Sequence, residues 1–380
     1  MHVVHISHSY YPVLGGKERA LQRLTEELVK LGHEVHIITA IHGAEHRPRE
    51  EVLNGVYIHR VRSWKLCYPD LMIPREAPRD VIERADIVHG WSQNSYFTYK
   101  VCREAKKLGK PVIMYFLGVD YLKHHYNPFI RLFGYPYQKW ITKKIVKITD
   151  LALVTNEYEK KLLKEKYGIN AVVLPHGIDE IYLRLPNMAK YFRERYSIES
   201  RIIAYVGRLH PTKGLDLLIK AFAEVVKQVP DTILVVAGKG DEKYLKECMK
   251  LAKKLGIENK IKYLDYVPEN DKIALIDVAE VIVLPSKHAG ESYPLIISEV
   301  IARQKMIITT CKGTLPYLGE SIIVVEPRVH SLANTIIHLL TKQSYAKQIK
   351  YRHVSTWRNI AQWLLDLYHE INTESTVIES

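Results

Sequence analysis

The sequence predicts two doubly wound α/β domains, each built on a parallel sheet. Apolar strand-like runs alternate with helical patterns from one end of the chain to the other, which is typical of parallel α/β folds. A length of 380 residues suits two domains better than one core. Segment 174–186, rich in turn-forming residues, interrupts the alternation and indicates a linker. We therefore expect domains at 1–182 and 183–353, followed by a final helix and tail at 354–380.

The first domain is predicted from six apolar runs separated by amphipathic stretches. A helix over Lys17–Leu31 follows the first run, and Gly32 ends it as glycine commonly ends helices. The expected strands are Val3–Ser7, Glu34–Thr39, Val56–Val61, Ile87–Gly90, Pro111–Phe116 and Leu151–Thr155. The other expected helices are Pro78–Arg84, Ser95–Leu108 and Tyr137–Ile148.

The second domain repeats this pattern after a short basic helix, Met188–Tyr196. Its expected strands are Ile202–Val206, Ile233–Ala237, Ile261–Leu264, Val281–Leu284, Met306–Thr309 and Ile322–Val325. The final helix, Val354–Ile371, is amphipathic, and its apolar face carries Trp357, Ile360, Leu364, Leu367 and Tyr368.

The composition, with 47% hydrophobic and 26% charged residues, is typical of a soluble globular protein. The apolar runs fall far short of the roughly 20 residues that a membrane-spanning helix needs. The N-terminus lacks the pattern of a signal peptide, so we expect a cytoplasmic location. The cysteines have neither zinc nor disulfide spacing and are expected to be core thiols: Cys67, Cys102, Cys248 and Cys311.

Positive charge is concentrated in the first domain. The formal net charge is +13, and residues 101–150 hold ten Lys and Arg against three Asp and Glu. An acidic partner is therefore expected, either an anionic lipid or a phosphorylated acceptor. Nucleic acid is disfavoured because the chain shows no recognised nucleic-acid-binding motif.

One predicted helix in this basic segment has the pattern of a membrane-surface helix. Its lysines lie beside an apolar stripe of Ile141, Ile145 and Ile148. We predict peripheral contact with the inner face of a membrane, and the alternative is a solvated basic face that the isoleucines pack onto its own domain. The lysines concerned are Lys139, Lys143, Lys144 and Lys147.

Several glycine-containing turns follow predicted strands, where doubly wound sheets bind their ligands. The turn 207–214 opens a helix and carries Arg208 and Lys213, whose charges and hydrogen-bond donors favour a diphosphate. The pairs Gly15–Gly16 and Gly238–Gly240 follow other predicted strands, and because glycine has no side chain a ligand could approach the backbone closely there. Taken alone, each pair indicates a tight turn or a pocket wall.

The stretch 286–299 is where we expect the chemistry. Pro294 suits the first turn of a helix, whose unpaired N–H groups favour an anion. Glu291 and Glu299 are too far apart for an adjacent acid/base pair and are interpreted as two hydroxyl-binding carboxylates. No Asp-x-Asp pair occurs, so we expect catalysis without a metal or a bound cofactor.

In order and spacing, these motifs resemble the retaining glycosyltransferases of family 4. The resemblance rests on Gly15-Gly16-x-Glu18, Gly207-Arg208-x4-Lys213, Gly238-x-Gly240, Val283–Ser286, Glu291-x7-Glu299 and the helix at Trp357. It covers nearly the whole chain. It implies two facing Rossmann-like domains, the B-type glycosyltransferase (GT-B) fold, with the active site in the cleft between the domains.

The resemblance also implies roles for individual residues. Arg208 and Lys213 hold the donor diphosphate, Glu299 binds the ribose hydroxyls, Glu291 binds the hydroxyls of the transferred sugar, and Gly16 lies against the donor phosphate. Arg208, Lys213 and Glu291 are therefore the expected catalytic residues. The other expected donor-binding residues are Gly15, Gly207, Gly238, Gly240, Gly290, Ser292, Tyr293, Pro294 and Leu295.

Three positions depart from the family pattern. Leu117 stands where the family usually has His, Tyr317 where Glu is common, and Gln304 where Gly is frequent. These departures concern the identity of the donor sugar and the turnover rate, and they leave the diphosphate site intact.

The expected function is transfer of a hexose-type sugar from a nucleotide diphosphate-sugar donor to an acceptor hydroxyl with retained anomeric configuration. The acceptor is expected to be lipid-linked or phosphorylated. Two alternatives stay open, namely a nucleotide-sugar epimerase or phosphorylase on the same fold, and a non-catalytic sugar-nucleotide-binding partner. A transferase requires an acceptor, an epimerase does not, and a non-catalytic partner would bind the donor without consuming it.

Overall fold

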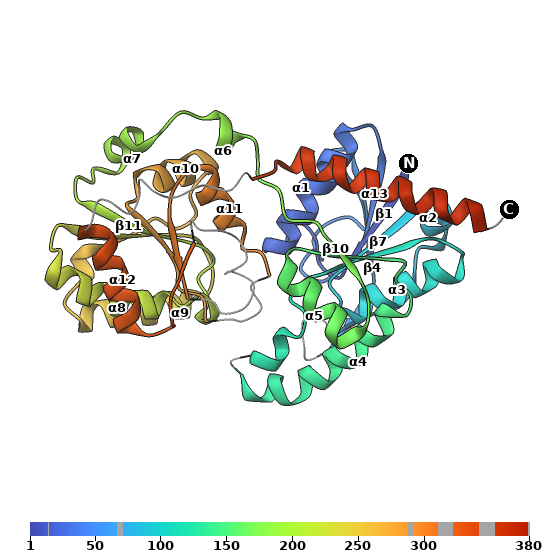
Figure 1. Cartoon of the computed structure of the whole chain (residues 1–380), viewed down its shortest axis with the longest axis horizontal. Helices are drawn as coiled ribbons and strands as arrows, with labels where there is room; N and C mark the ends of the chain where they lie inside the picture. The colour runs from blue at the N-terminus through green and yellow to red at the C-terminus, as the bar shows by residue number, and fades with distance from the viewer. Residues whose placement is uncertain are drawn as a thin grey trace. The chain divides into compact units, whose positions relative to one another are not determined.

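A computed structural model describes residues 1–13, 15–66, 71–125, 127–287, 292–310, 322–341 and 354–378. The chain divides into two compact units, each with its own parallel or mainly parallel sheet (Figure 1). Unit 1 is Met1–Gly177 with Ser355–Ser380, and unit 2 is Ile178–Val354. The division precedes Tyr182 because Ile178 and Tyr182 pack into the core of unit 2.

The sheet of unit 1 has the order β10-β9-β8-β7-β1-β2-β4-β3. Its strands are β1 (His2–Ser7), β2 (Glu34–Ala40), β3 (Glu50–Leu53), β4 (Val56–Val61), β7 (Ile87–Trp91), β8 (Val112–Phe116), β9 (Leu151–Val154) and β10 (Ala171–Val173). All six predicted strands are confirmed. Sequence reasoning missed β3, β10 and the hairpin of β5 (Ser63–Lys65) and β6 (Met72–Pro74), all too short to show a clear period.

Strand β3 is antiparallel to β4, unlike the other pairs in this sheet. Asn54 and Gly55 join the two strands, and both have positive φ angles, 52° and 82°. An Asn-Gly pair with two positive φ angles is the usual two-residue hairpin turn. The eight-stranded sheet thus ends in an antiparallel edge.

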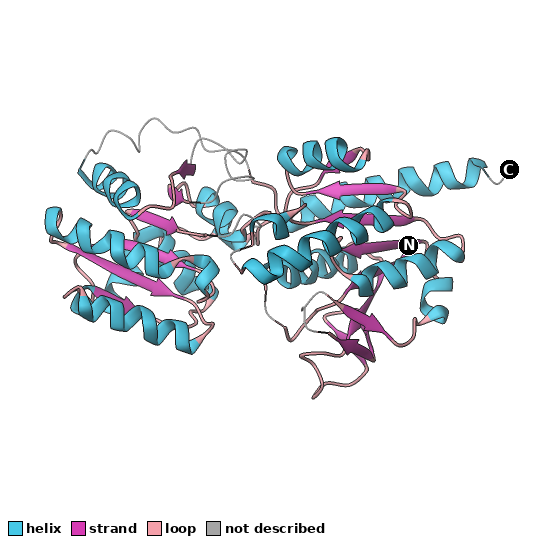
Figure 2. Cartoon of the chain, turned by 90° about the horizontal axis from the view of Figure 1, so that it is seen from below, coloured by secondary structure: helices cyan, strands magenta, loops and turns pink. Residues whose placement is uncertain are grey.

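Helices cover both faces of the unit 1 sheet (Figure 2). They are α1 (Gly16–Lys30), α2 (Arg79–Glu83), α3 (Tyr96–Lys107), α4 (Tyr135–Val146), α5 (Glu157–Tyr167) and α13 (Trp357–Ile378), with short turns η1 (Tyr121–His124) and η2 (Ile130–Gly134). The predicted apolar face of α13 is confirmed, because its five residues are all buried.

The last helix, α13, is attached to the sheet of unit 1 by a buried polar contact. The hydroxyl of Tyr368 lies 2.6 Å from Nδ1 of His89, and Nε1 of Trp91 donates to Nδ1 of His5 at 3.1 Å. Burial lowers the pKa of His5 to about 3 and that of His89 well below its usual range. Both imidazoles are therefore neutral at physiological pH.

Unit 2 has a wholly parallel sheet with the order β13-β12-β11-β14-β15-β16. The six predicted strands are confirmed as β11 (Arg201–Val206), β12 (Thr232–Ala237), β13 (Ile261–Tyr263), β14 (Val281–Leu284), β15 (Ile307–Thr309) and β16 (Ile322–Val324). The helices are α6 (Ile181–Arg184), α7 (Ala189–Tyr196), α8 (Leu215–Gln228), α9 (Glu242–Lys254), α10 (Glu269–Val278), α11 (Leu295–Ala302) and α12 (Val329–Thr341), with turns η3 (Pro211–Lys213) and η4 (Glu258–Lys260).

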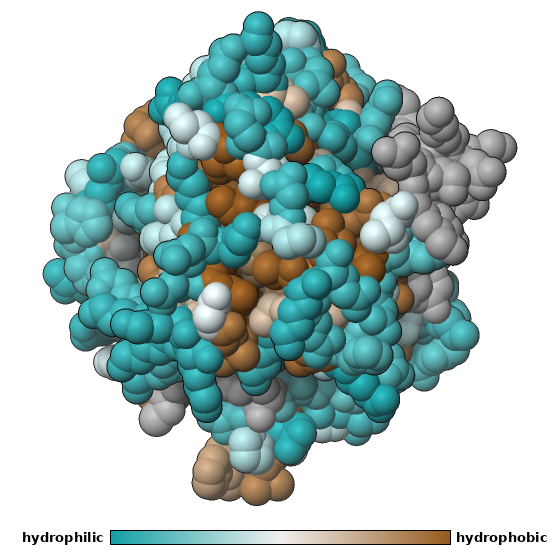
Figure 3. Space-filling view, turned by 90° about the vertical axis from the view of Figure 1, so that its left-hand side faces the viewer, coloured by the Kyte–Doolittle hydropathy of each residue, from teal (hydrophilic) through white to brown (hydrophobic). Residues whose placement is uncertain are grey.

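The face drawn in Figure 3 is mainly hydrophilic at its rim, with apolar side chains visible between polar ones nearer its middle. Among the described residues, no helix is both long enough and apolar enough to cross a membrane. Cys102 and Cys248 are free and buried, as expected for core thiols. Cys67 and Cys311 lie outside the described residues.

We predict that Gly177→Ala destabilises unit 1 by about 1–3 kcal/mol, the usual cost of overpacking. A Cβ at Gly177 would lie 2.6 Å from the backbone of Trp357, so the first turn of α13 would have to move. Chemical denaturation followed by circular dichroism measures the loss.

The matched control is Gly134→Ala. Gly134 has helical dihedral angles, and its nearest neighbours would be the side-chain tips of Leu122 and Ile130 at 3.2 and 3.4 Å. Alanine is preferred to glycine in helical backbone, so this change should be neutral or stabilising. Equal losses of stability in the two variants would contradict the close contact between Gly177 and the backbone of Trp357.

Candidate active site

The strand order of unit 2 reverses at β11. Strands β12 and β13 follow β11 on one side of the sheet, whereas β14, β15 and β16 lie on the other. Ligands of doubly wound sheets bind outside the carboxyl ends of the strands at such a switch point. The loop after β11 carries Arg208 and Lys213, and the loop after β14 leads to α11.

The loop after β11 is held by backbone hydrogen bonds to both neighbouring loops. The N–H of Gly207 donates to the carbonyl of Ala237 at 3.0 Å, and the N–H of Leu209 donates to that of Lys239 at 2.9 Å. On the other side, the N–H of Lys287 donates to the carbonyl of Thr212 at 2.8 Å. The backbone that carries Arg208 and Lys213 is therefore fixed from two directions.

Glycines allow these loops to approach closely. A Cβ added to Gly238 would lie 2.0 Å from the carbonyl oxygen of Gly207. A Cβ added to Gly240 would lie 2.1 Å from the carbonyl oxygen of Leu209. Gly214 has φ +72°, and its Cβ would meet the carbonyl oxygen of Pro285 at 2.0 Å. Gly238 and Gly240 thus have a packing role besides the donor contact predicted for them.

Arg208 and Lys213 differ in their surroundings. The side chain of Arg208 is exposed, and within the described part of the chain it makes no ion pair. Its carbonyl accepts a hydrogen bond from the Tyr205 hydroxyl at 2.9 Å, which fixes the backbone beneath it. Lys213 is half-buried at the end of η3. Arg208 can therefore bind an anion without first breaking an ion pair to a described residue.

A third cation near this loop is already neutralised. Nζ of Lys287 lies 2.5 Å from Asp216, whose other oxygen accepts from the Tyr244 hydroxyl at 2.7 Å. Burial by itself would raise the pKa of Asp216, but the hydrogen bonds from Lys287 and Tyr244 outweigh it and lower that pKa. Asp216 stays ionised at neutral pH and positions Lys287.

Glu299 lies on α11 with its carboxylate buried against α10. Its Oε1 accepts from Nζ of Lys272 at 2.9 Å, and Lys272 also pairs with Glu269 at 2.8 Å. The ring of Tyr182 covers the same ammonium at 5.2 Å. This lysine was missed from the sequence because nothing in the spacing of Lys272 and Glu299 indicates the contact.

The entry to α11 differs slightly from the prediction. Pro294 occupies the N-cap position with an extended ψ of 118°, and the helix begins at Leu295, so Pro294 is not in the first turn. The hydroxyl of Tyr293 accepts from Ser298 at 2.9 Å, and Ser292 is half-buried. Gly290 and Glu291 lie outside the described residues.

The first helix of unit 1 provides the predicted open backbone. Gly16 is its first residue, is exposed, and would have nothing within 4 Å of an added Cβ. At Gly15, by contrast, a Cβ would meet Oε2 of Glu18 at 2.2 Å. Glu18 is itself held by the Ser9 hydroxyl at 2.5 Å and by Lys17 at 3.4 Å. Gly16 thus leaves room for a ligand, and Gly15 makes room for Glu18.

Two of the three departures from the family pattern lie among the described residues. The N–H of Leu117 donates to Oε1 of Gln93 at 2.8 Å, and the next N–H, of Gly118, donates to buried Glu159 at 2.6 Å. Gln304 has φ +53° directly after α11, a conformation that glycine adopts without strain. The frequent glycine at this position therefore reflects helix termination. Tyr317 lies outside the described residues.

Comparison with known proteins identifies the family of both units. The family model of glycosyltransferase family 4 matches residues 14–181, and that of the glycosyl transferases group 1 matches residues 190–354. The chain belongs to glycosyltransferase family 4. It is a glycosyltransferase with the GT-B fold, as the sequence motifs predicted.

Relatives of this glycosyltransferase act on inositol compounds. It is 22% identical to the phosphatidylinositol N-acetylglucosaminyltransferase GPI3 subunit of Saccharomyces cerevisiae, over 97% of this chain and 82% of the relative. It is 25% identical to the D-inositol 3-phosphate glycosyltransferase of Corynebacterium glutamicum, over 60% of this chain and 59% of the relative. Sucrose-phosphate synthase of Thermosynechococcus elongatus shares its fold, with a TM-score of 0.79 and 18% identity. The match covers 98% of this chain and 99% of the synthase chain.

We predict that Lys272→Met destabilises unit 2 of this glycosyltransferase by about 3–5 kcal/mol, the typical cost of leaving a buried charge without its partner. Glu299 would keep its buried carboxylate but lose the ammonium at 2.9 Å. Urea denaturation of the purified variant measures the change.

Lys161→Met is the control, because Lys161 and Glu165 form a pair in which both side chains are exposed, 3.8 Å apart. Exposed pairs contribute little to stability, so the control should resemble the parent protein. If both variants lost the same stability, the buried pair would have no special importance.

Proposed function

We propose that this protein is a retaining, metal-independent hexosyltransferase that uses a nucleotide diphosphate-sugar donor and a lipid-linked or phosphorylated acceptor hydroxyl. The proposal is carried by one observation: Arg208 and Lys213 lie on a loop that is fixed from both sides at the switch point of unit 2. A cationic loop fixed before the donor binds suits a diphosphate leaving group.

In this proposal, Arg208 and Lys213 act most strongly in the transition state. Negative charge grows on the diphosphate as the bond to the sugar breaks, so a fixed cation stabilises the transition state more than the bound donor. The planar guanidinium of Arg208 can donate two parallel hydrogen bonds to phosphate oxygens, and Lys213 supplies a compact charge. Gly16 would let the backbone of α1 approach the phosphate.

The remaining donor contacts are assigned from the family pattern. Glu299 would bind the ribose hydroxyls through Oε2, since Lys272 holds Oε1. Glu291 would bind the hydroxyls of the transferred sugar. Because Arg208, Lys213 and helix N–H groups meet the diphosphate charge, neither a divalent metal nor a cofactor is needed in this mechanism.

The acceptor proposal draws on the relatives and on the charge of unit 1. The curated relatives are named for phosphatidylinositol and inositol 3-phosphate, which both carry phosphate. Residues 101–150 of this chain carry a large excess of positive charge. Both observations favour an anionic acceptor.

We further propose that this basic segment lies on the cytoplasmic face of a membrane rich in anionic lipid. Lys139, Lys143, Lys144 and Lys147 are all exposed, as predicted. Ile141 and Ile145 are fully buried in the core of unit 1, so the isoleucine stripe holds α4 on its own domain and cannot enter a membrane. The alternative in which the isoleucines pack α4 onto its own domain is therefore confirmed, and a membrane contact would need other apolar side chains.

Other apolar side chains beside the lysines are exposed. Between Phe129 and Trp140 four large apolar side chains are exposed, with exposed fractions of 72% for Phe129, 65% for Leu132, 70% for Phe133 and 47% for Trp140. Large exposed apolar groups next to clustered lysines are typical of surfaces that bind anionic membranes. We call these four apolar side chains, together with Lys139, Lys143, Lys144 and Lys147, the membrane surface.

We predict that Arg208→Ala and Lys213→Ala each lower kcat about 10²–10³-fold and weaken donor binding much less, because the charge that they meet grows in the transition state. The base is chosen first by thermal shift with UDP, GDP and ADP. Turnover and donor affinity are then measured with the matching nucleotide sugars.

Lys220→Ala is the control, since Lys220 is an exposed lysine on α8 outside the proposed site. Transfer by the parent protein should also persist in EDTA. If donor affinity fell by as large a factor as kcat, Arg208 and Lys213 would contribute to binding of the donor but not specifically to the transition state. Activity that required added magnesium would disprove the metal-independent mechanism.

We predict that replacing Lys139, Lys143, Lys144 and Lys147 by Gln greatly reduces binding to anionic vesicles at low salt. Attraction to an anionic surface is worth about 1 kcal/mol per basic residue before screening. Replacing Phe129, Leu132 and Phe133 by Ser should weaken the binding that remains at high salt. Vesicle co-sedimentation with anionic and neutral lipid measures both effects.

The matched control removes the same charge from another helix. Lys246, Lys250, Lys253 and Lys254 are exposed on α9 of unit 2, and their replacement by Gln should leave vesicle binding unchanged. Equal losses in the two quadruple variants would show that only net charge matters and that no specific membrane surface exists.

A further inference from the structure

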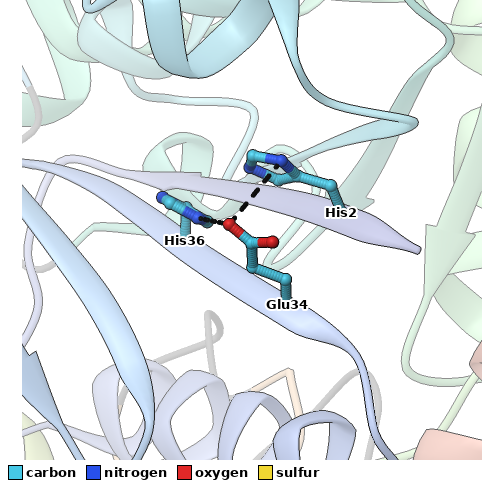
Figure 4. A group of neighbouring side chains, drawn as sticks. All are labelled: His2, Glu34 and His36. Atoms are coloured by element: carbon cyan, nitrogen blue, oxygen red, sulfur yellow. Dashed lines mark hydrogen bonds and ion pairs between the residues drawn. The ribbon is translucent and has the colours of Figure 1, made fainter.

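Unit 1 carries a group of imidazole and carboxylate side chains at the amino ends of its strands. His2 lies at the start of β1, and Glu34 and His36 lie at the start of β2. In the parallel register, His2 is opposite Glu34 and Val4 is opposite His36, so the three side chains share one face of the sheet. Figure 4 shows both rings directed toward the Glu34 carboxylate.

The spacing of these groups suits a small divalent cation. Nε2 of His36 is 2.9 Å and Nδ1 of His2 is 3.9 Å from Oε1 of Glu34. One ligand atom from each of the three residues lies within 4.8 Å of the others. Zinc bonds of about 2.0–2.1 Å in a tetrahedral site place ligand atoms roughly 3.3 Å apart. The two distances lie on either side of that value, and Glu34 is half-exposed and can adjust.

A second observation concerns the hydrogen bonds of His36. Its Nδ1 lies 2.8 Å from Nε2 of His59, and Nδ1 of His59 lies 2.5 Å from Glu50. With the contact to Glu34, these are three short contacts that each need one proton, whereas two neutral imidazoles supply only two. A metal ion on Nε2 of His36 removes the shortage, because His36 then donates to His59 and His59 donates to Glu50.

The ring of His2 adds a third observation. Among the described residues its buried Nε2 has no hydrogen-bond partner, and its Nδ1 approaches Glu34 only at 3.9 Å, so metal binding would displace no strong hydrogen bond of this ring.

We propose that His2, Glu34 and His36 bind one zinc ion, and that His59 and Glu50 orient His36. Two imidazoles and one carboxylate are a ligand set that zinc accepts, with a fourth position left for water. Hydrogen bonds from the second ring nitrogen of a ligand histidine commonly fix its orientation. The ion would join β1 to β2 and, through His59, to β4.

The zinc ion would stabilise unit 1 and take no part in sugar transfer. It lies at the amino ends of the strands, whereas the loops that carry Gly16 and Leu117 follow the carboxyl ends of β1 and β8. The proposal is thus independent of the transfer reaction, and loss of zinc should lower the stability of unit 1 while leaving the diphosphate site of unit 2 unchanged.

The test uses the full-length protein without a polyhistidine tag, dialysed against zinc and analysed for bound metal. We expect one tightly bound zinc per chain and a higher thermal unfolding midpoint with zinc. Glu34→Gln and His36→Gln should each weaken zinc binding at least tenfold, since each removes one of three ligands. Cobalt bound in place of zinc should give the visible absorption of a tetrahedral site, and this absorption should be lost in both variants.

Two further variants sharpen the test. His46→Gln changes an exposed histidine outside the cluster and should bind zinc like the parent. Glu50→Ala should bind one zinc with affinity reduced about tenfold, as expected when a residue that orients a ligand is removed. Glu34 is half-exposed, so its variant should fold even if His36→Gln does not. Equal zinc affinity in the parent and Glu34→Gln, or no bound zinc in the parent, would overturn the proposal.

Discussion

The candidate active site depends on the close approach of three backbone loops in unit 2. The loop after β11 is in contact with the loops after β12 and β14, and the contacts at Gly214, Gly238 and Gly240 leave no room for a Cβ. Because the backbone is fixed by these contacts and their hydrogen bonds, only the side chain of Arg208 has to be ordered when a ligand binds. A cation on a fixed loop costs less entropy to position than one on a mobile loop, and this is the physical basis of preorganised charge stabilisation.

Much of the fold could be predicted because parallel strands leave a strong sequence signal. Strands buried on both faces give apolar runs such as β11 and β14, and all twelve predicted strands are present. The loops that carry Arg208 and Lys213 could be placed because they follow those runs. Strand β3 escaped prediction since it is a short, half-polar edge strand, Glu50–Leu53, that its hairpin with β4 stabilises.

Contacts between side chains distant in the sequence could not be predicted in the same way. The pair of Lys272 and Glu299 depends on the packing of α10 near α11, and the cluster at Glu34 depends on the register of β1, β2 and β4. The register brings His36 beside Tyr57, and His59 follows on the same face. The basic helix α4 shows the same limit, because periodicity found its apolar stripe but not whether that stripe faces the core or the solvent.

The polarity of the parallel strands explains how a cation site and an anion site can exist in one chain. At the carboxyl ends, loops open into helices whose N–H groups face outward, and this edge suits a diphosphate. At the amino ends of β1 and β2, the strands begin with His2 and Glu34, whose lone pairs suit a cation. An ion there would link β1 and β2 and, through His59, reach β4, which pairs with the antiparallel edge strand β3. Glu50 on β3 pairs with His59, so the ion would organise the sheet from β1 outward to its edge strand.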